Sequence, residues 1–149
     1  SEEYLNSEKY EIRHWKLDAP HSIAPVIARV NRIRREHPAL QQDWTLRFHP
    51  VDNEQLIAYS KTSPDKRDVI ITVVNLDPHH RHAGWVTLDL AALGLPHDVP
   101  YQVHDLLTDE RYIWHGAHNY VELDPHIMPA HIFLVRQRVR TEHDFEYYE

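Results

Sequence analysis

The sequence predicts a mainly β fold, an antiparallel β-sandwich preceded by one amphipathic helix. Apolar residues recur at helical spacing between residues 22 and 37, and from Thr45 onward they recur at about every second position. Turn-forming residues separate the short runs of this second region, and short strands at such spacing are typical of sandwiches. With 149 residues, the chain is long enough to bury a core.

The helix is expected over residues Ser22–His37. Ser22 is the predicted N-cap, Pro25 is tolerated in the first turn, and Pro38 ends the helix. Its apolar stripe consists of Ile23, Val26, Ile27, Val30 and Ile33. Such a stripe needs an apolar surface to pack against.

Eight strands are expected after the helix. They are Thr45–His49, Gln55–Lys61, Val69–Leu76, Gly84–Leu90, Tyr101–Asp105, Tyr112–Trp114, Tyr120–Leu123 and His131–Arg136. Because residues 69–74 are apolar almost throughout, this strand should be central and covered on both faces. The runs 55–59 and 85–90 alternate more clearly, which predicts one wetter face for each. The acidic and aromatic tail, residues 141–149, is expected to be peripheral.

Composition limits the function classes. The chain has 16 Lys and Arg against 23 Asp and Glu, and a formal charge of −7 argues against binding to a nucleic-acid backbone. The lack of Cys excludes disulfides and thiolate metal sites, and it fits a reducing, cytoplasmic location. No apolar run approaches the ~20 residues that a membrane-spanning helix needs. Because the chain opens on a polar segment with no initiating Met, we expect a piece of a longer protein, with a processed mature protein as the alternative.

Histidine is abundant, with 14 in the chain. His79, His80 and His82 follow Asp77-Pro78 and could form a metal site, but a His-Glu-x-x-His motif and Cys partners are absent. A solvated turn is therefore the favoured interpretation, with an incidental metal site as the alternative. Three histidines within predicted strands are expected to be hydrogen-bonded structural residues: His49, His104 and His131.

The residues alone offer no catalytic constellation. No acidic residues stand out as the paired carboxylates of glycoside chemistry, and there is no Gly-x-Ser-x-Gly motif or Gly-rich phosphate loop. This pattern favours a non-catalytic accessory domain. Trp44, Trp85 and Trp114 lie in or beside predicted strands, where the core is their favoured location and stacking on a sugar is the alternative.

The opening segment is rich in acids, Lys and Tyr, and its composition alone favours a solvated loop over a sugar contact. Several segments together nevertheless resemble one family. They are Glu2–Glu11, Val30–Leu40, Val74–Pro78, Tyr101–Thr108, Asn119–Pro125, Pro129–Phe133 and Val139–Phe145. The set resembles the C-terminal end of the α-1,4-glucan:maltose-1-phosphate maltosyltransferases, in glycoside hydrolase family 13. His37 departs from the family pattern, in which Asn is more usual.

The resemblance implies a division of the chain at about residue 43. Residues 1–43 would form the last loop and helix of a catalytic (β/α)₈ barrel, and residues 44–149 the all-β domain of amylase-type enzymes with a short tail. The nucleophile and general acid would lie upstream of Ser1, so the piece itself is expected to be inactive. Lys9 and Tyr10 match the family positions that contact the maltosyl unit of the donor.

The resemblance also implies partners and chemistry. The parent enzyme would move maltosyl from α-maltose 1-phosphate to the non-reducing end of an α-1,4-glucan, with retention and without a metal or cofactor. The barrel of the same polypeptide would be the main partner, and homodimerisation is left open. Two alternatives remain: another amylase-type hydrolase or branching enzyme, and a stand-alone glucan-binding module.

Overall fold

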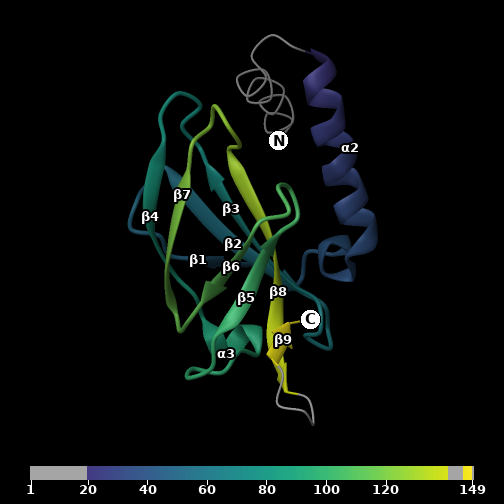
Figure 1. Cartoon of the computed structure of the whole chain (residues 1–149), viewed down its shortest axis with the longest axis vertical. Coiled ribbons are helices and arrows are strands. Elements are labelled where there is room, and N and C mark those ends of the chain that lie inside the picture. The colour runs from purple at the N-terminus through teal and green to yellow at the C-terminus, as the bar shows by residue number, and fades with distance from the viewer. Residues whose placement is uncertain (1–19, 141–145, 149) are drawn as a thin grey trace.

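The computed structural model describes residues 20–140 and 146–148 (Figure 1). The described helices are α2 (Pro20–Glu36), the 3₁₀ helix η2 (Pro38–Gln41) and α3 (Leu90–Leu93). The described strands are β1 (Arg47–His49), β2 (Leu56–Thr62), β3 (Val69–Asn75), β4 (His82–Thr87), β5 (Tyr101–Asp105), β6 (Arg111–Trp114), β7 (His118–Leu123), β8 (Ala130–Arg140) and β9 (Glu146–Tyr148). No described helix is both long enough and apolar enough to cross a membrane.

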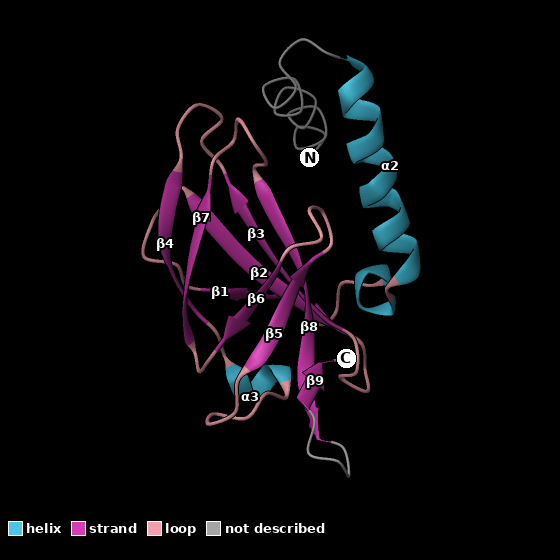
Figure 2. Cartoon of the chain, viewed as in Figure 1, coloured by secondary structure: helices cyan, strands magenta, loops and turns pink. Residues whose placement is uncertain are grey.

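The strands form two antiparallel layers (Figure 2). The larger sheet runs in the order β1-β2-β3-β8-β5-β6, with β9 beside β8, and the smaller sheet pairs β4 with β7. Every pairing is antiparallel. The predicted antiparallel sandwich is therefore confirmed. So is the central position of β3, which lies between β2 and β8 and is buried at six of its seven residues.

The core lies between the two layers. In β2 and β7, buried side chains alternate with more exposed ones, as the period of two requires. The larger side chains of the core come from the inward positions of both sheets and from α3: Leu56, Ile71, Val86, Leu90, Leu93, Tyr101, Trp114, Val121 and Phe133. The core thus fixes which face of each strand remains available for other contacts.

Helix α2 departs from its expected start. It is already helical at Pro20, so the predicted N-cap at Ser22 is wrong. Proline has a fixed φ that suits the first turn of a helix, which allows α2 to begin at Pro20. The end agrees to within one residue, because His37 has an extended φ of −120° and Pro38 follows. Ile33 of the predicted stripe is buried, whereas Ile27 stays 42% exposed.

Three short elements were missed: η2, α3 and β9. The strand expected over residues 84–90 ends at Thr87, because Asp89 caps α3 by accepting a hydrogen bond from the backbone N–H of Ala92. Gly94 ends the helix at a φ of 73°, which glycine adopts without strain. In the tail, β9 pairs with residues 138–140 of β8. Around Leu90, the capping residues Asp89 and Gly94 therefore favour a short helix over the strand that the alternating pattern predicts.

Candidate functional site

The histidine-rich loop between β3 and β4 is organised around one carboxylate. Nδ1 of His80 lies 3.0 Å and Nε2 of His82 lies 2.9 Å from Oδ2 of Asp77, and the backbone N–H of His79 donates to Oδ1. These hydrogen bonds, led by that from His82, hold the pKa of Asp77 far below its usual range. Within residues 20–140 and 146–148, no three His, Asp or Glu side chains form a group suited to a metal ion. The loop is thus a hydrogen-bonded turn.

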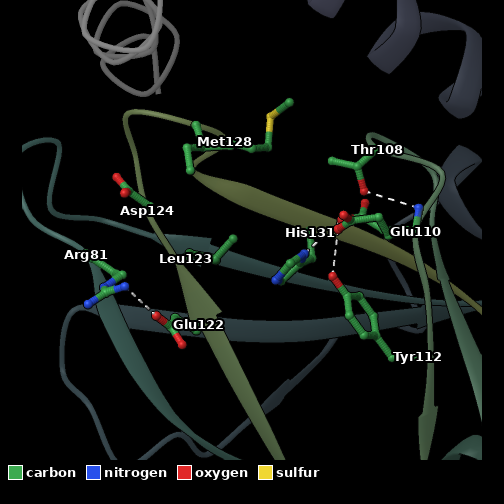
Figure 3. Close-up of a pocket in the computed structure, with 11 residues that line it drawn as sticks. Arg81, Thr108, Glu110, Tyr112, Glu122, Leu123, Asp124, Met128 and His131 are labelled. Atoms are coloured by element: carbon green, nitrogen blue, oxygen red, sulfur yellow. Dashed lines mark hydrogen bonds and ion pairs between the residues drawn. The ribbon is translucent and has the colours of Figure 1, made fainter.

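A cavity of about 320 Å³ opens at one end of the sandwich (Figure 3). It lies where β5 ends, β6 and β8 begin, and the chain between β7 and β8 turns back. Its polar lining residues include Arg81, Asp105, Thr108, Glu110, Tyr112, Glu122, Asp124 and His131. Charged and hydrogen-bonding groups from Arg81 and from the stretches 105–112 and 122–131 therefore meet here.

Asp105 and His131 form the buried floor of this cavity. The Asp105 side chain is fully buried, and it accepts hydrogen bonds from the backbone N–H groups of Leu107 (3.0 Å) and Ile132 (3.2 Å). Its second oxygen lies 2.8 Å from Nδ1 of His131. The His131 ring stacks on Phe133, with 4.5 Å between centroids and 19° between planes. The imidazole is thus fixed in one orientation by a carboxylate and an aromatic face.

Tyr112 and Glu110 form one wall of the cavity. The Tyr112 hydroxyl donates to Oε1 of Glu110 at 2.7 Å, and the ring meets Phe133 edge-on at 6.0 Å. Desolvation, together with the neighbouring Glu110 carboxylate, raises the pKa of Tyr112 to about 12. The tyrosine is therefore a neutral hydrogen-bonding group at physiological pH.

The remaining carboxylates of the cavity are each engaged by a protein partner. Glu122 pairs with Arg81 at 2.9 Å, and Asp124 accepts from the backbone N–H of His126 at 2.9 Å. The Thr108 hydroxyl oxygen accepts from the backbone N–H of Glu110. The arrangement suits contact with a polar surface or a hydroxyl-bearing molecule.

Comparison with known proteins gives the family. Residues 48–135 match the family model described as "GLGE, C-terminal". The chain belongs to this GLGE C-terminal family.

Its relatives share one name. The chain is 47% identical over 90% of its length to the α-1,4-glucan:maltose-1-phosphate maltosyltransferase of Chlorobaculum tepidum, and 45% identical over 99% to that of Salinibacter ruber. It is 49% identical over 92% to maltosyltransferase 2 of Streptomyces coelicolor. The chain spans only 21–22% of the length of these three relatives.

A solved structure supports the fold of the GLGE C-terminal domain. A noncanonic maltogenic α-amylase, AmyB, from Thermotoga neapolitana aligns with 75% of this chain and 25% of its own. The TM-score is 0.56 and the sequence identity 12%. The likeness shows that the chain shares its fold with a part of this amylase.

The strand histidines of the family domain are confirmed as hydrogen-bonded structural residues. Nε2 of His49 lies 2.8 Å from the Ser60 hydroxyl, and Nε2 of His104 lies 2.6 Å from Oδ1 of Asp109. His131 has the Asp105 contact described above. What the sequence missed was Asp105 itself, because its histidine partner lies 26 residues away and no short motif links them.

Of the three predictions for tryptophan residues, one is confirmed and two are wrong. Trp114 is 6% exposed and belongs to the core, as predicted. The core interpretation is wrong for Trp44, which is 74% exposed in the turn before β1, and for Trp85, which is 51% exposed on an outward position of β4. Lys9 and Tyr10, the predicted sugar-contacting residues, lie outside the described residues.

Proposed function

We propose that this chain is the C-terminal part of a maltosyltransferase acting on α-maltose 1-phosphate and α-1,4-glucans. The observation that carries the proposal is the identity of 45–49%, over 90% or more of the chain, to relatives named for that reaction. The longer enzyme would retain anomeric configuration through a covalent glycosyl-enzyme intermediate. Both catalytic carboxylates would stand in a (β/α)₈ barrel within the same polypeptide.

In this proposal, residues 1–43 complete the barrel and residues 44–149 support it. The support would act through hydrogen bonds between Asp68 and the segment that follows α2. The Asp68 carboxylate accepts from the Ala39 backbone N–H and lies 2.9 Å from Nδ1 of His37. Ala39 is fully buried. Farther along α2, Nε of Arg29 donates to the backbone oxygen of Leu106 at 3.0 Å. Through these contacts the sheet domain would hold the last barrel helix in place.

Lys9 and Tyr10 are proposed to contact the maltosyl unit of the donor, by analogy with the family. A lysine ammonium offers three charged donors to sugar hydroxyls, and a tyrosine adds a hydrogen bond and a ring face. The chemistry needs no metal or cofactor. A cytoplasmic location for the enzyme is part of the proposal.

The proposal is tested by phosphate release from α-maltose 1-phosphate in the presence of glycogen. The longer protein should release phosphate and elongate the glucan, and its Lys9→Ala variant should lose about tenfold or more in kcat/KM. The 149-residue chain should remain at the level of a heat-killed control. Turnover by that chain alone, or glucan hydrolysis by the longer protein without phosphate release, would overturn the proposal.

A further inference from the structure

The outer face of the β4–β7 sheet carries an exposed aromatic pair. Trp85 and Tyr120 are register partners on these strands, and they are 51% and 50% exposed. Their ring centroids lie 5.6 Å apart, with 65° between the planes. Two large rings that share so much exposed surface on one face are typical of a contact site.

Hydrogen-bonding groups flank the rings along both strands. On one side, Glu122 accepts from the Tyr120 hydroxyl at 3.2 Å and pairs with Arg81 at 2.9 Å. On the other, the register pair Thr87 and His118 places a hydroxyl and an imidazole 3.2 Å apart. The face therefore presents apolar rings between two polar rims, a combination that suits an amphipathic ligand.

The backbone that carries Trp85 is firmly held. The N–H of Trp85 donates to Oδ1 of Asp52 at 2.7 Å, and the N–H of Asp52 returns a bond to the Trp85 oxygen. A Cβ at the preceding Gly84 would lie 2.8 Å from that same Asp52 oxygen, so glycine is required for this approach. Because the ring stands on an ordered strand, little ordering is left for a ligand to impose.

The face points away from helix α2. Figure 1 shows α2 on one side of the larger sheet, with β4 and β7 on the opposite side. The inward neighbours of the aromatic pair, Val86 and Val121, belong to the core between the layers. The glucan-binding proposal below, which rests on the proposed function, requires that this face also stays open to solvent in the longer enzyme.

We propose that the Trp85–Tyr120 face binds a segment of α-1,4-glucan. A glucose ring has an apolar C–H face that packs on an aromatic ring and a rim of hydroxyls that suits Glu122, Arg81 and His118. The rings meet edge to face at 65°, so they do not form one flat platform, which suits a curved α-1,4-linked chain better than a flat β-1,4-linked one. The choice of glucan as ligand rests on the proposed function.

The experiment is affinity electrophoresis of the 149-residue chain in gels with and without glycogen. The chain should be retarded by glycogen and not by a β-linked glucan. Trp85→Ala should raise the dissociation constant about tenfold, with Tyr120→Ala intermediate and Trp85→Phe close to the parent chain. Trp44→Ala is the matched control, because Trp44 is exposed but has no ring contact within the described part of the chain.

Near-ultraviolet circular dichroism and a thermal melt establish that each variant is folded. Equal retardation of Trp85→Ala and Trp44→Ala, or no retardation of the folded parent chain, would overturn the glucan-binding proposal. In the longer enzyme, Trp85→Ala should raise KM for glycogen and leave kcat and the KM for α-maltose 1-phosphate unchanged. The binding assay uses no donor, so it remains informative even if maltosyl transfer fails.

Discussion

Two Trp–Tyr pairs in this domain have the same construction and opposite surroundings. Tyr101 and Trp114 are register partners on β5 and β6, and Trp85 and Tyr120 are register partners on β4 and β7. Both pairs meet edge-on, at 6.4 Å and 5.6 Å between centroids. The first pair points into the core and the second points outward.

The two pairs differ in what satisfies their polar atoms. The buried Tyr101 hydroxyl donates to the Gly116 oxygen at 2.8 Å and accepts from the Asn119 amide at 3.1 Å, and burial raises the pKa of Tyr101 to about 12. The exposed Tyr120 hydroxyl meets only the Glu122 carboxylate at the surface among the described residues. The same cross-strand pair therefore stabilises the fold on one face and is available for recognition on the other.

The largest expected difference is in the stability of the two tryptophan variants. Trp114→Ala should lower the free energy of unfolding by about 3–5 kcal/mol, because it leaves a cavity beside Tyr101 and Phe133. Trp85→Ala should cost less than about 1 kcal/mol, since the ring is half exposed. Urea denaturation of both variants measures the difference, and similar costs would contradict the assignment of one pair to structure and the other to the surface.

The sequence predicted the positions of the strands better than it predicted which tryptophans face the core. Alternation identified each strand of the two layers except β9, and the apolar run of β3 correctly indicated the central strand. Both predictions succeeded because the burial of one or both faces of a strand determines the pattern of apolar residues along it. Whether a Trp in such a pattern points inward depends on register with a distant partner. The Trp85 and Tyr120 positions are 35 residues apart, so a local pattern could not settle it.

The candidate site was less predictable for the same reason. Asp105 meets His131 only because β5 and β8 are neighbours in the sheet. Local turn chemistry was predicted in part. Asp77 was assigned to a turn and contacts groups within five residues, whereas the cap formed by Asp89 was missed although Ala92 is three residues away. Contacts of short sequence separation can be anticipated from residue types, whereas long-range pairs need the fold.

The buried Asp105–His131 contact and the partly exposed Asp77–His82 contact should also differ in what they contribute to stability. Asp105→Ala should lower the free energy of unfolding by about 3 kcal/mol, because it strips the partner from two backbone N–H groups and from His131 in a buried place. Asp77→Ala should lower the unfolding midpoint far less, because water can replace the carboxylate at the loop. Urea denaturation of both variants at pH 7 measures the contrast, and a loss for Asp77→Ala as large as that for Asp105→Ala would contradict it.

The smallest expected effect concerns two histidine–hydroxyl contacts, one in each environment. His49 is buried against Ser60, and His118 lies exposed against Thr87. Burial, reinforced by the charge of Arg47, lowers the pKa of His49 below its ordinary value. The unfolded chain therefore takes up the proton first, so stability is fully present above the unfolded pKa of about 6.5 and declines as the pH falls through the lowered folded pKa.

Replacing each histidine by glutamine separates this contribution from those of the other titrating groups. His49→Gln should flatten the fall in unfolding midpoint between about pH 7.5 and pH 5, because the group that resists protonation in the fold is gone. His118→Gln keeps the buried His49 and should follow the parent chain. Thermal melts of the three proteins across this range provide the measurement. Parallel profiles for all three would mean that His49 accepts a proton within the fold as readily as in water, and that burial against Ser60 does not define its environment.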